Sequence, residues 1–172
     1  EISACLVGSE MCIRDRNSTQ NIVCSGIQDA LEQEKLQGSE IQMSLITVDD
    51  TNTFSVEESI RDIFMDQTLP DIIICLNELS TTCVYQAVVD YNCVGEIAIL
   101  GYYDTDTILK AIERNVITAT ISIDTEQMGA FCVDALQEYY NYGYTSQYFT
   151  ADVTVIDQSN VEEYLGKQEE AE

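Results

Sequence analysis

Apolar residues along the chain follow two alternating patterns. In segment 18–34 they recur at the spacing of one helical face, with Ile22, Val23, Ile27 and Leu31 on the same side. In Asp71–Leu76 they form a continuous run, which is typical of a strand buried on both faces. These patterns predict helices at 18–34, 55–67, 80–91, 105–114, 126–140 and 160–165, and strands at 41–48, 71–76, 96–100, 118–123 and 152–156.

The regular alternation of strands and helices indicates a doubly wound α/β fold with a mostly parallel sheet. The connections are long enough to hold a helix, as right-handed parallel crossovers require. Helices are expected on both faces of the sheet, and Ser55 with Glu58 is expected to form a capping box. The helix over 126–140 is expected to turn its apolar residues inward, namely Met128, Phe131, Cys132, Ala135, Leu136 and Tyr139.

The first sixteen residues are a separate case. Residues 4–16 read ACLVGSEMCIRDR and resemble a string that recurs where sequencing-adaptor bases have been translated, so 1–16 is expected to be a replaced segment. The alternative is that Ile2–Val7 is a genuine first strand, or one that substitutes for a missing edge strand. Residues 17–165 are then the folded domain, and 166–172 are a frayed acidic tail.

Charge and composition narrow the range of functions. Seven Lys and Arg against 31 Asp and Glu give a formal charge of −24, which opposes binding to nucleic acid or to an anionic membrane surface. The chain has no histidine, which excludes Ser-His and Cys-His catalytic pairs. No apolar run is long enough to insert across a bilayer. The seven cysteines form no CxxC pair, so no metal or cofactor is expected, and Cys75 and Cys132 are interpreted as small buried hydrophobic residues.

Polar and aromatic side chains follow the ends of the expected strands. Asn77 follows 71–76, the group Tyr102, Tyr103 and Asp104 follows 96–100, and Asp124 follows 118–123. Doubly wound sheets bind ligands outside the carboxyl ends of their strands. Amides, carboxylates and rings suit a neutral polyhydroxylated ligand, whereas a phosphate would need a Gly-rich turn and a lysine, neither of which is present there.

The same residue types also have a simpler structural role. Asn, Asp, Ser and Thr are favoured helix N-caps, and Asp49, Thr105 and Thr125 are expected mainly to cap. Asp104 and Asp106 form a DxD pair, which without further oxygen ligands is weak evidence for calcium. Five tyrosines straddle the end of the last long helix and the following loop, and they are expected to pack against another surface rather than form a stacking platform: Tyr139, Tyr140, Tyr142, Tyr144 and Tyr148.

Three stretches together resemble a known family. They are PDIIICLNELSTTCVYQAVVD, GEIAILGYYDTDTILKAIERNVITATISIDTEQMGAFCVDALQEY and ADVTVIDQSNVEEYL. They look like the sugar-binding proteins of ABC transporters, of the ribose- and galactose-binding type, a fold shared with the ligand domains of lactose-repressor-type regulators. The similarity covers about residues 17 to 165 and matches the C-terminal lobe of a two-lobed protein, together with the late helix that crosses to the N-terminal lobe.

The resemblance also implies a set of ligand contacts. Asn77 matches the family's ligand-binding asparagine in kind. Asn21 stands where ribose binders have an arginine, and Tyr103 stands where they have an aspartate. Either Ile123 or Asp124 stands where they have a glutamine. The expected ligand-binding residues are therefore Asn77, Asp104, Tyr103, Tyr102, Asn21 and Asp124.

The expected function is non-enzymatic binding of a small polyhydroxylated solute, a sugar, for delivery to an ABC transporter permease. The expected partners are that sugar, the permease and the missing N-terminal lobe, and the expected location is extracytoplasmic. The alternative is the ligand-sensing domain of a lactose-repressor-type regulator, which the strong acidity disfavours because a regulator must approach DNA. A third interpretation, a phospho-acceptor receiver domain, needs a lysine beside an aspartate pocket, and none directly follows a strand.

Overall fold

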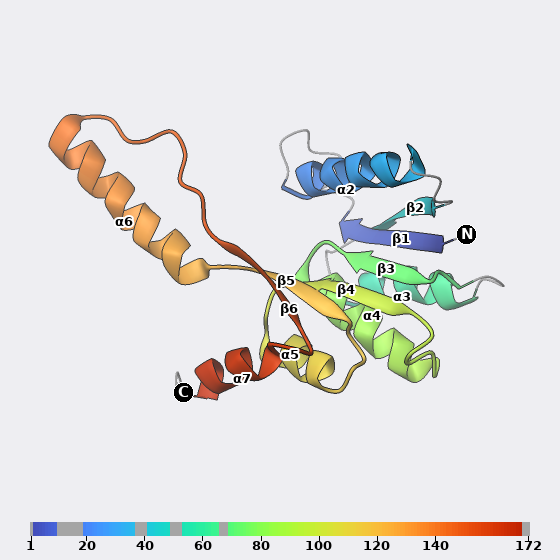
Figure 1. Ribbon diagram of the computed structural model, residues 1–172. Helices are drawn as coiled ribbons and strands as arrows, with labels where there is room; N and C mark the ends of the chain where they lie inside the picture. The colour runs from blue at the N-terminus through green and yellow to red at the C-terminus, as the bar shows by residue number, and fades with distance from the viewer. Residues whose placement is uncertain (1, 10–18, 37–40, 49–52, 66–68, 170–172) are drawn as a thin grey trace.

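The computed structural model describes residues 2–9, 19–36, 41–48, 53–65 and 69–169 (Figure 1). Strands and helices alternate along these residues in the predicted order. The strands are β1 (Ile2–Ser9), β2 (Ile41–Val48), β3 (Ile72–Cys75), β4 (Ala98–Tyr102), β5 (Ala119–Ile123) and β6 (Val153–Asp157). The helices are α2 (Thr19–Leu36), α3 (Thr53–Met65), α4 (Glu78–Asp90), α5 (Asp106–Glu113), α6 (Thr125–Tyr142) and α7 (Val161–Glu169).

The six described strands form one sheet in the order β2-β1-β3-β4-β5-β6. Every neighbouring pair is parallel except β5 and β6, which run antiparallel. The predicted doubly wound, mostly parallel sheet is therefore confirmed. The strand expected as an alternative over Ile2–Val7 is present as β1, but it lies between β2 and β3 rather than at an edge of the sheet.

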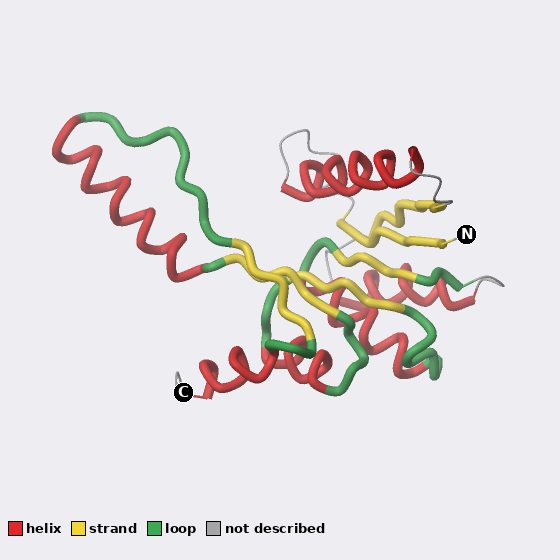
Figure 2. Tube along the Cα trace, viewed as in Figure 1, coloured by secondary structure: helices red, strands yellow, loops and turns green. Residues whose placement is uncertain are grey.

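One face of the sheet carries the main hydrophobic core. Helices α3, α4, α5 and α7 lie on this face, and their apolar sides meet the inward residues of β3 and β4 (Figures 1 and 2). Ile73, Cys75 and Ile99 from the strands are buried against Val84, Leu109 and their neighbours in the helices. The prediction that Cys75 is a small buried hydrophobic residue is confirmed.

The other face is covered only in part. Helix α2 packs there through a small cluster in which Cys24 and Leu76 are buried beside Val23 and Ile74. In the described chain, no helix lies on this face beyond β3 (Figure 1). The expectation that helices cover both faces of the strands over 96–100 and 118–123 is therefore wrong, because β4 and β5 have a helical layer on one face. The apolar residues left there, called the open face below, are Leu100, Tyr102, Ile121, Ile123, Val153 and Val155.

A second departure from the prediction is the position of α6. This helix and the segment 143–152 leave the sheet together as an arm between β5 and β6 (Figure 2). None of its eighteen residues is buried. The expectation that Cys132 and the other apolar residues of α6 point into the core is wrong: Cys132, Leu136 and Tyr139 are exposed, and Phe131 packs on Phe149 of the arm with ring centroids 5.3 Å apart.

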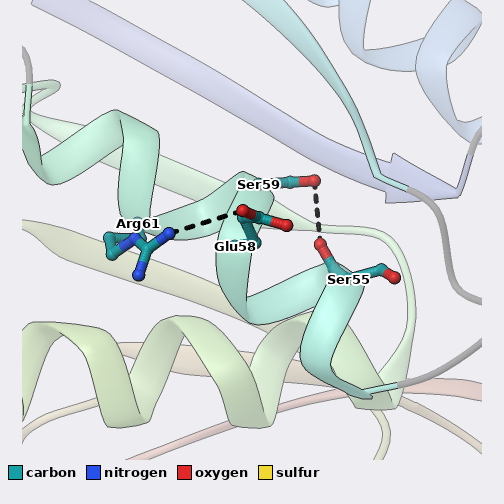
Figure 3. Close-up of polar contacts among 4 residues, drawn as sticks. All are labelled: Ser55, Glu58, Ser59 and Arg61. Atoms are coloured by element: carbon teal, nitrogen blue, oxygen red, sulfur yellow. Dashed lines mark hydrogen bonds and ion pairs between the residues drawn. The ribbon is translucent and has the colours of Figure 1, made fainter.

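Element ends differ from the prediction at two further places. Helix α3 begins at Thr53, so Ser55 lies inside the helix, and its carbonyl accepts a hydrogen bond from Ser59 Oγ at 3.0 Å (Figure 3). Glu58 pairs instead with Arg61 at 3.6 Å, and the predicted capping box is therefore wrong. Helix α7 continues to Glu169, so residues 166–169 are helical rather than frayed.

No helix among the described residues is both long enough and apolar enough to cross a membrane.

Candidate functional site at the carboxyl edge of the sheet

The parallel strands β3, β4 and β5 end at the same edge of the sheet, and most of the predicted site residues lie there. Asn77 follows β3, Tyr102 ends β4 with Tyr103 and Asp104 after it, and Asp124 follows β5. The expectation that these residues share one rim is met by the topology. Asn21 lies in the first turn of α2, but its side chain is outside the described part of the structure, and Asp49 is also outside it.

Asn77 is the N-cap of α4. Its side-chain Oδ1 accepts a hydrogen bond from the backbone N–H of Ser80 at 2.7 Å. Its carbonyl accepts from Ser80 Oγ at 3.0 Å and from Thr81 Oγ1 at 2.8 Å. These bonds fix the half-buried side chain at the rim, with its oxygen used for capping and its amide Nδ2 as the group that can donate to a ligand.

Thr81 ties Asn77 to the end of β4. Its buried hydroxyl donates to the Asn77 carbonyl and accepts from the backbone N–H of Tyr102 at 3.0 Å. The neighbouring residue is Gly101, where a Cβ would lie 2.7 Å from Thr81 Cγ2. Glycine is required there because α4 and β4 approach each other this closely. The positions of Asn77 and of the β4 terminus are therefore coupled.

Tyr103 has a left-handed backbone, with φ at 84°. Its N–H donates to the carbonyl of Ile121 at 2.8 Å, and its own carbonyl accepts from Thr120 Oγ1 at 2.6 Å. An aromatic residue at positive φ is strained by about 1 kcal/mol or more, and such strain concentrates at functional sites. Tyr103 as a whole is 37% exposed, so it remains accessible at the rim.

Asp104 is held at the rim by the next strand. Its Oδ2 accepts a hydrogen bond from Ser122 Oγ at 2.7 Å, and the carboxylate is half-buried. Ser122 is itself buried, so the bond orients the carboxylate from below.

Asp124 belongs to the root of the arm. Its Oδ1 accepts from the backbone N–H of Gln127 at 2.8 Å, which makes it the N-cap of α6. Its own N–H donates to the carbonyl of Asp152 at 3.0 Å, and Gln127 Oε1 accepts from the N–H of Asp152 at 2.7 Å. Asp124 thus has a structural role at the place where the chain leaves and re-enters the sheet.

The capping residues differ from those expected. Thr105 stands at the N-cap position of α5 but makes no side-chain capping bond, and Thr125 is the first residue of α6. The capping bonds come from Asn77 and Asp124, both of which were predicted as ligand contacts. The buried hydroxyls of Thr81, Thr120 and Ser122 were not predicted. Polar residues alternating inside the apolar run ATISI are the pattern that could have revealed two of them.

The DxD pair does not form a metal site. Asp106 pairs with Lys110 at 2.6 Å one helical turn later, so its carboxylate faces along α5 rather than toward a shared ion. Within the described residues there is no group of three or more Cys, Asp or Glu side chains placed to hold a metal.

A separate groove lies between α3 and α4. It has a volume of about 230 Å³ and includes Glu57, Arg61, Cys83 and Tyr91 in its lining. Burial raises the pKa of the Cys83 thiol, and the nearby Glu57 carboxylate raises it further. The lining residues come from α3, from α4 and from Tyr91 after α4, and Asn77, Tyr103 and Asp104 are not among them, so the groove is distinct from the strand-end rim.

Comparison with known proteins identifies structures that share this fold. No family model and no curated protein matches the sequence. Solved structures do match, and they include sugar-binding proteins of ABC transporters. GanP, a glucose-galactose binding protein from Geobacillus stearothermophilus, is 18% identical with a TM-score of 0.77 over 92% of this chain and 54% of its own.

Two proteins from Bacillus halodurans are similar to the same degree. A sugar ABC transporter sugar-binding protein is 17% identical with a TM-score of 0.78, over 95% of this chain and 57% of its own. A solute-binding protein with bound myo-inositol is 14% identical with a TM-score of 0.73, over 97% of this chain and 55% of its own. These likenesses establish the fold as one lobe of a periplasmic-binding-protein type, and the chain spans about half the length of each of these proteins.

Proposed function

We propose that the strand-end rim binds a small polyhydroxylated solute, a sugar, without catalysis. The observation that carries this proposal is the rim itself: an amide, a carboxylate and an exposed ring held within one edge of the sheet by buried hydroxyls. The solved proteins that share the fold bind glucose-galactose, myo-inositol or other sugars according to their descriptions, which supports the ligand class.

Each rim residue has a defined chemical role in this proposal. The Nδ2 group of Asn77 donates to a sugar hydroxyl, while Oδ1 stays on the Ser80 N–H. The Asp104 carboxylate accepts from adjacent hydroxyls in charge-assisted hydrogen bonds. The Tyr103 ring covers the apolar face of the sugar, because Tyr102 is in register with Ile121 on the open face instead. Asp124, at the end of β5, is assigned a secondary contact beside its capping role, and Asn21 is retained as a proposed contact from the sequence alone.

The proposal extends to a role in transport. A second lobe closes over the ligand, and an ABC transporter permease then receives the solute on the extracytoplasmic side. The descriptions of the matching proteins as ABC transporter components support this assignment. No catalytic step is assigned to any residue of the rim.

Calorimetric titration with a panel of monosaccharides and inositols tests the proposal. Asn77→Asp is the informative variant, because aspartate keeps a capping oxygen for Ser80 and replaces the amide donor with a charged acceptor. We expect this variant and Asp104→Asn each to weaken binding by about 5- to 100-fold, the range for a lost polar contact in a desolvated site. Asp106→Asn, two residues along the chain, is the matched control and should leave the affinity unchanged.

The titration has clear opposing outcomes. Because one lobe supplies only part of the contacts, the ligand is titrated to millimolar concentration against concentrated protein. Absence of heat with every sugar, or a bound sugar whose affinity ignores both Asn77 and Asp104, would reject the rim as the binding site.

A further inference from the structure

Strand β5 carries two buried hydroxyl groups directly below the rim. Thr120 and Ser122 are 1% and 6% exposed, and they lie two residues apart, so both side chains point to the same face of the sheet. This is the face with the main core, called the core face below, because Thr120 is paired with Ile156 of that core. The Thr120 hydroxyl donates to the carbonyl of Tyr103 at 2.6 Å, and the Ser122 hydroxyl donates to Oδ2 of Asp104 at 2.7 Å. We call these two hydroxyls the β5 clamp.

The backbone of Tyr103 determines which side of the sheet Asp104 faces. Tyr102 is in register with Ile121, and the Tyr103 N–H donates to the Ile121 carbonyl, so the parallel ladder continues to this point. In a strand that continued further, Asp104 would follow Tyr102 onto the open face, because side chains two residues apart point the same way. The left-handed φ of 84° at Tyr103 ends the strand, and the Asp104 carboxylate reaches Ser122 on the core face instead.

The β5 clamp stabilises this unusual turn. A bulky aromatic residue at positive φ is unfavourable and persists where the surrounding structure holds it. Thr120 bonds to the carbonyl of that same residue, and Ser122 bonds to the carboxylate of the next one. The second bond has a charged acceptor and a buried donor, which makes it stronger than a hydrogen bond between neutral groups in water.

We infer that the β5 clamp determines the stereochemical selectivity of the rim, with Thr120 and Ser122 acting as positioning residues through Tyr103 and Asp104. This inference rests on the proposed function of the rim as a sugar site. Epimeric sugars differ only in the direction of one hydroxyl, and hydrogen bonds weaken steeply when their angle is poor. A carboxylate held in one orientation therefore distinguishes two epimers, whereas a carboxylate that rotates adapts to either.

Paired substitutions at Thr120 separate its hydroxyl from its methyl group. Thr120→Val keeps the shape and loses the donor, whereas Thr120→Ser keeps the donor and loses the methyl group. Ser122→Ala removes the other donor of the clamp. Thr154→Val is the matched control, because Thr154 lies opposite Ser122 on β6 and its hydroxyl donates to no rim residue in the described structure.

Hydrogen exchange of the Tyr103 amide tests the clamp without any ligand. This N–H bonds to the Ile121 carbonyl, so it exchanges when the loop after β4 opens. Thr120→Val and Ser122→Ala should each speed its exchange by about 3- to 30-fold, the range for a lost hydrogen bond. Thr120→Ser and Thr154→Val should leave the rate close to that of the native chain. The amide of the buried Ile99 in β4 is the internal reference and should be unchanged in all four variants.

Calorimetric titration of epimer pairs tests the selectivity. The probes are D-glucose with D-galactose and D-ribose with D-xylose, since the members of each pair differ at one carbon. For a pair that the native chain distinguishes, Thr120→Val and Ser122→Ala should each lower the ratio of the two affinities by about 3-fold or more. Thr120→Ser and Thr154→Val should preserve that ratio. A loss of stability alone lowers both affinities together and leaves their ratio unchanged.

A double-mutant cycle shows whether Ser122 acts through Asp104. In the Asp104→Ala background the carboxylate is absent, so adding Ser122→Ala should not change the affinity ratio further. A further change in that background would mean that Ser122 affects the rim by another route.

The outcomes separate this inference from the proposed function. Absence of binding with every sugar rejects the proposed function and the selectivity with it. Sugar binding that does not distinguish the epimers, or whose affinity ratio survives Thr120→Val and Ser122→Ala, rejects the inference and leaves the proposed function standing. A Tyr103 exchange rate that responds to Thr120→Ser as strongly as to Thr120→Val also rejects the inference, because packing of the methyl group would then hold the turn.

Discussion

The helices packed on the sheet and the helix of the arm differ in whether their apolar side is buried. Leu109 in α5 is fully buried in the main core, whereas Leu136 in α6 is 70% exposed. Both lie in helices with apolar residues at a three-to-four spacing. The spacing defines which side of a helix is apolar, but it carries no information about which surface that side will meet.

The arm has a helix nonetheless, because its ends are specified locally. Asp124 caps the start with its side chain, and Gly143 ends the helix in the left-handed conformation, with φ at 75°. These two devices satisfy terminal backbone groups without any tertiary contact. In the body, by contrast, burial stabilises the helices, so equivalent substitutions in the two regions should have unequal costs.

The largest difference is expected for leucine truncation. Leu109→Ala leaves a cavity in the core and should lower the free energy of unfolding by about 2–5 kcal/mol. Leu136→Ala should lower it by less than about 0.5 kcal/mol at low protein concentration, because the side chain is exposed there. Urea denaturation followed by circular dichroism measures both. Equal costs in dilute solution would mean that α6 packs against the body.

Glycine replacement is the next largest contrast. Gly101→Ala brings a Cβ to 2.7 Å from Thr81 Cγ2 and 3.2 Å from Thr120 Oγ1, and should destabilise the body by about 1–3 kcal/mol. Gly129→Ala in α6 meets no atom within 4 Å and should favour the helix by about 1 kcal/mol. Thermal unfolding reports the first, and hydrogen exchange of the α6 amides reports the second. A neutral Gly101→Ala would show that α4 can move away from β4.

Sequence reasoning succeeded where one pattern has one structural outcome. Continuous apolar runs such as Asp71–Leu76 gave the buried parallel strands, and alternation of strands and helices gave the doubly wound fold. It placed Asn77, Tyr103 and Asp104 at one rim, because parallel strands end at the same edge.

Sequence reasoning failed where the structure depends on which surface a helix packs against, or on the residue at which a helix begins. Cys132 was expected to be buried, since its helical pattern is indistinguishable from that of α5. Thr105 was expected to cap α5 and makes no capping bond, whereas Asn77 and Asp124 make capping bonds that were not predicted, because capping geometry depends on where the helix begins, to within one residue. The bond from Ser122 to Asp104 joins residues eighteen positions apart, and sequence patterns do not register such pairs.

Capping residues provide the third contrast. Asn77→Ala removes the bond to Ser80 in a helix that packs on the core, and should destabilise the protein by about 0.5–2 kcal/mol. Asp124→Ala removes the equivalent bond to Gln127 in α6, where fraying is not coupled to the core, so global unfolding should change by less than this. Chemical denaturation of the two variants measures the free energy of unfolding that each one loses. A larger loss for Asp124→Ala would show that the root of the arm stabilises β5 and β6.

The smallest expected effect is a pH response confined to the arm. The N–H and hydroxyl of Ser146 bond to the Glu138 carboxylate and lower its pKa below the ordinary value for glutamate, about 4.3. A lowered pKa means that the ionised form is favoured in the folded arm. The contact is therefore complete above that ordinary value and is lost as the pH falls through the lowered one.

Asp157 provides the comparison in the body, since the N–H and hydroxyl of Ser159 lower its pKa in the same way. In an NMR titration, the Ser146 and Ser159 amide resonances should both move as their carboxylates gain protons. Around Ser146 the arm loop should also lose hydrogen-exchange protection, whereas Ser159 lies beside Val161, which is buried in the core and limits the local opening. Glu138→Gln should abolish the Ser146 titration and leave that of Ser159 intact. A Ser146 resonance that stays fixed through the acid range would show that Glu138 does not hold the arm loop, and the bracing of α6 would then rest on the Phe131–Phe149 contact and the Gln127–Asp152 bonds.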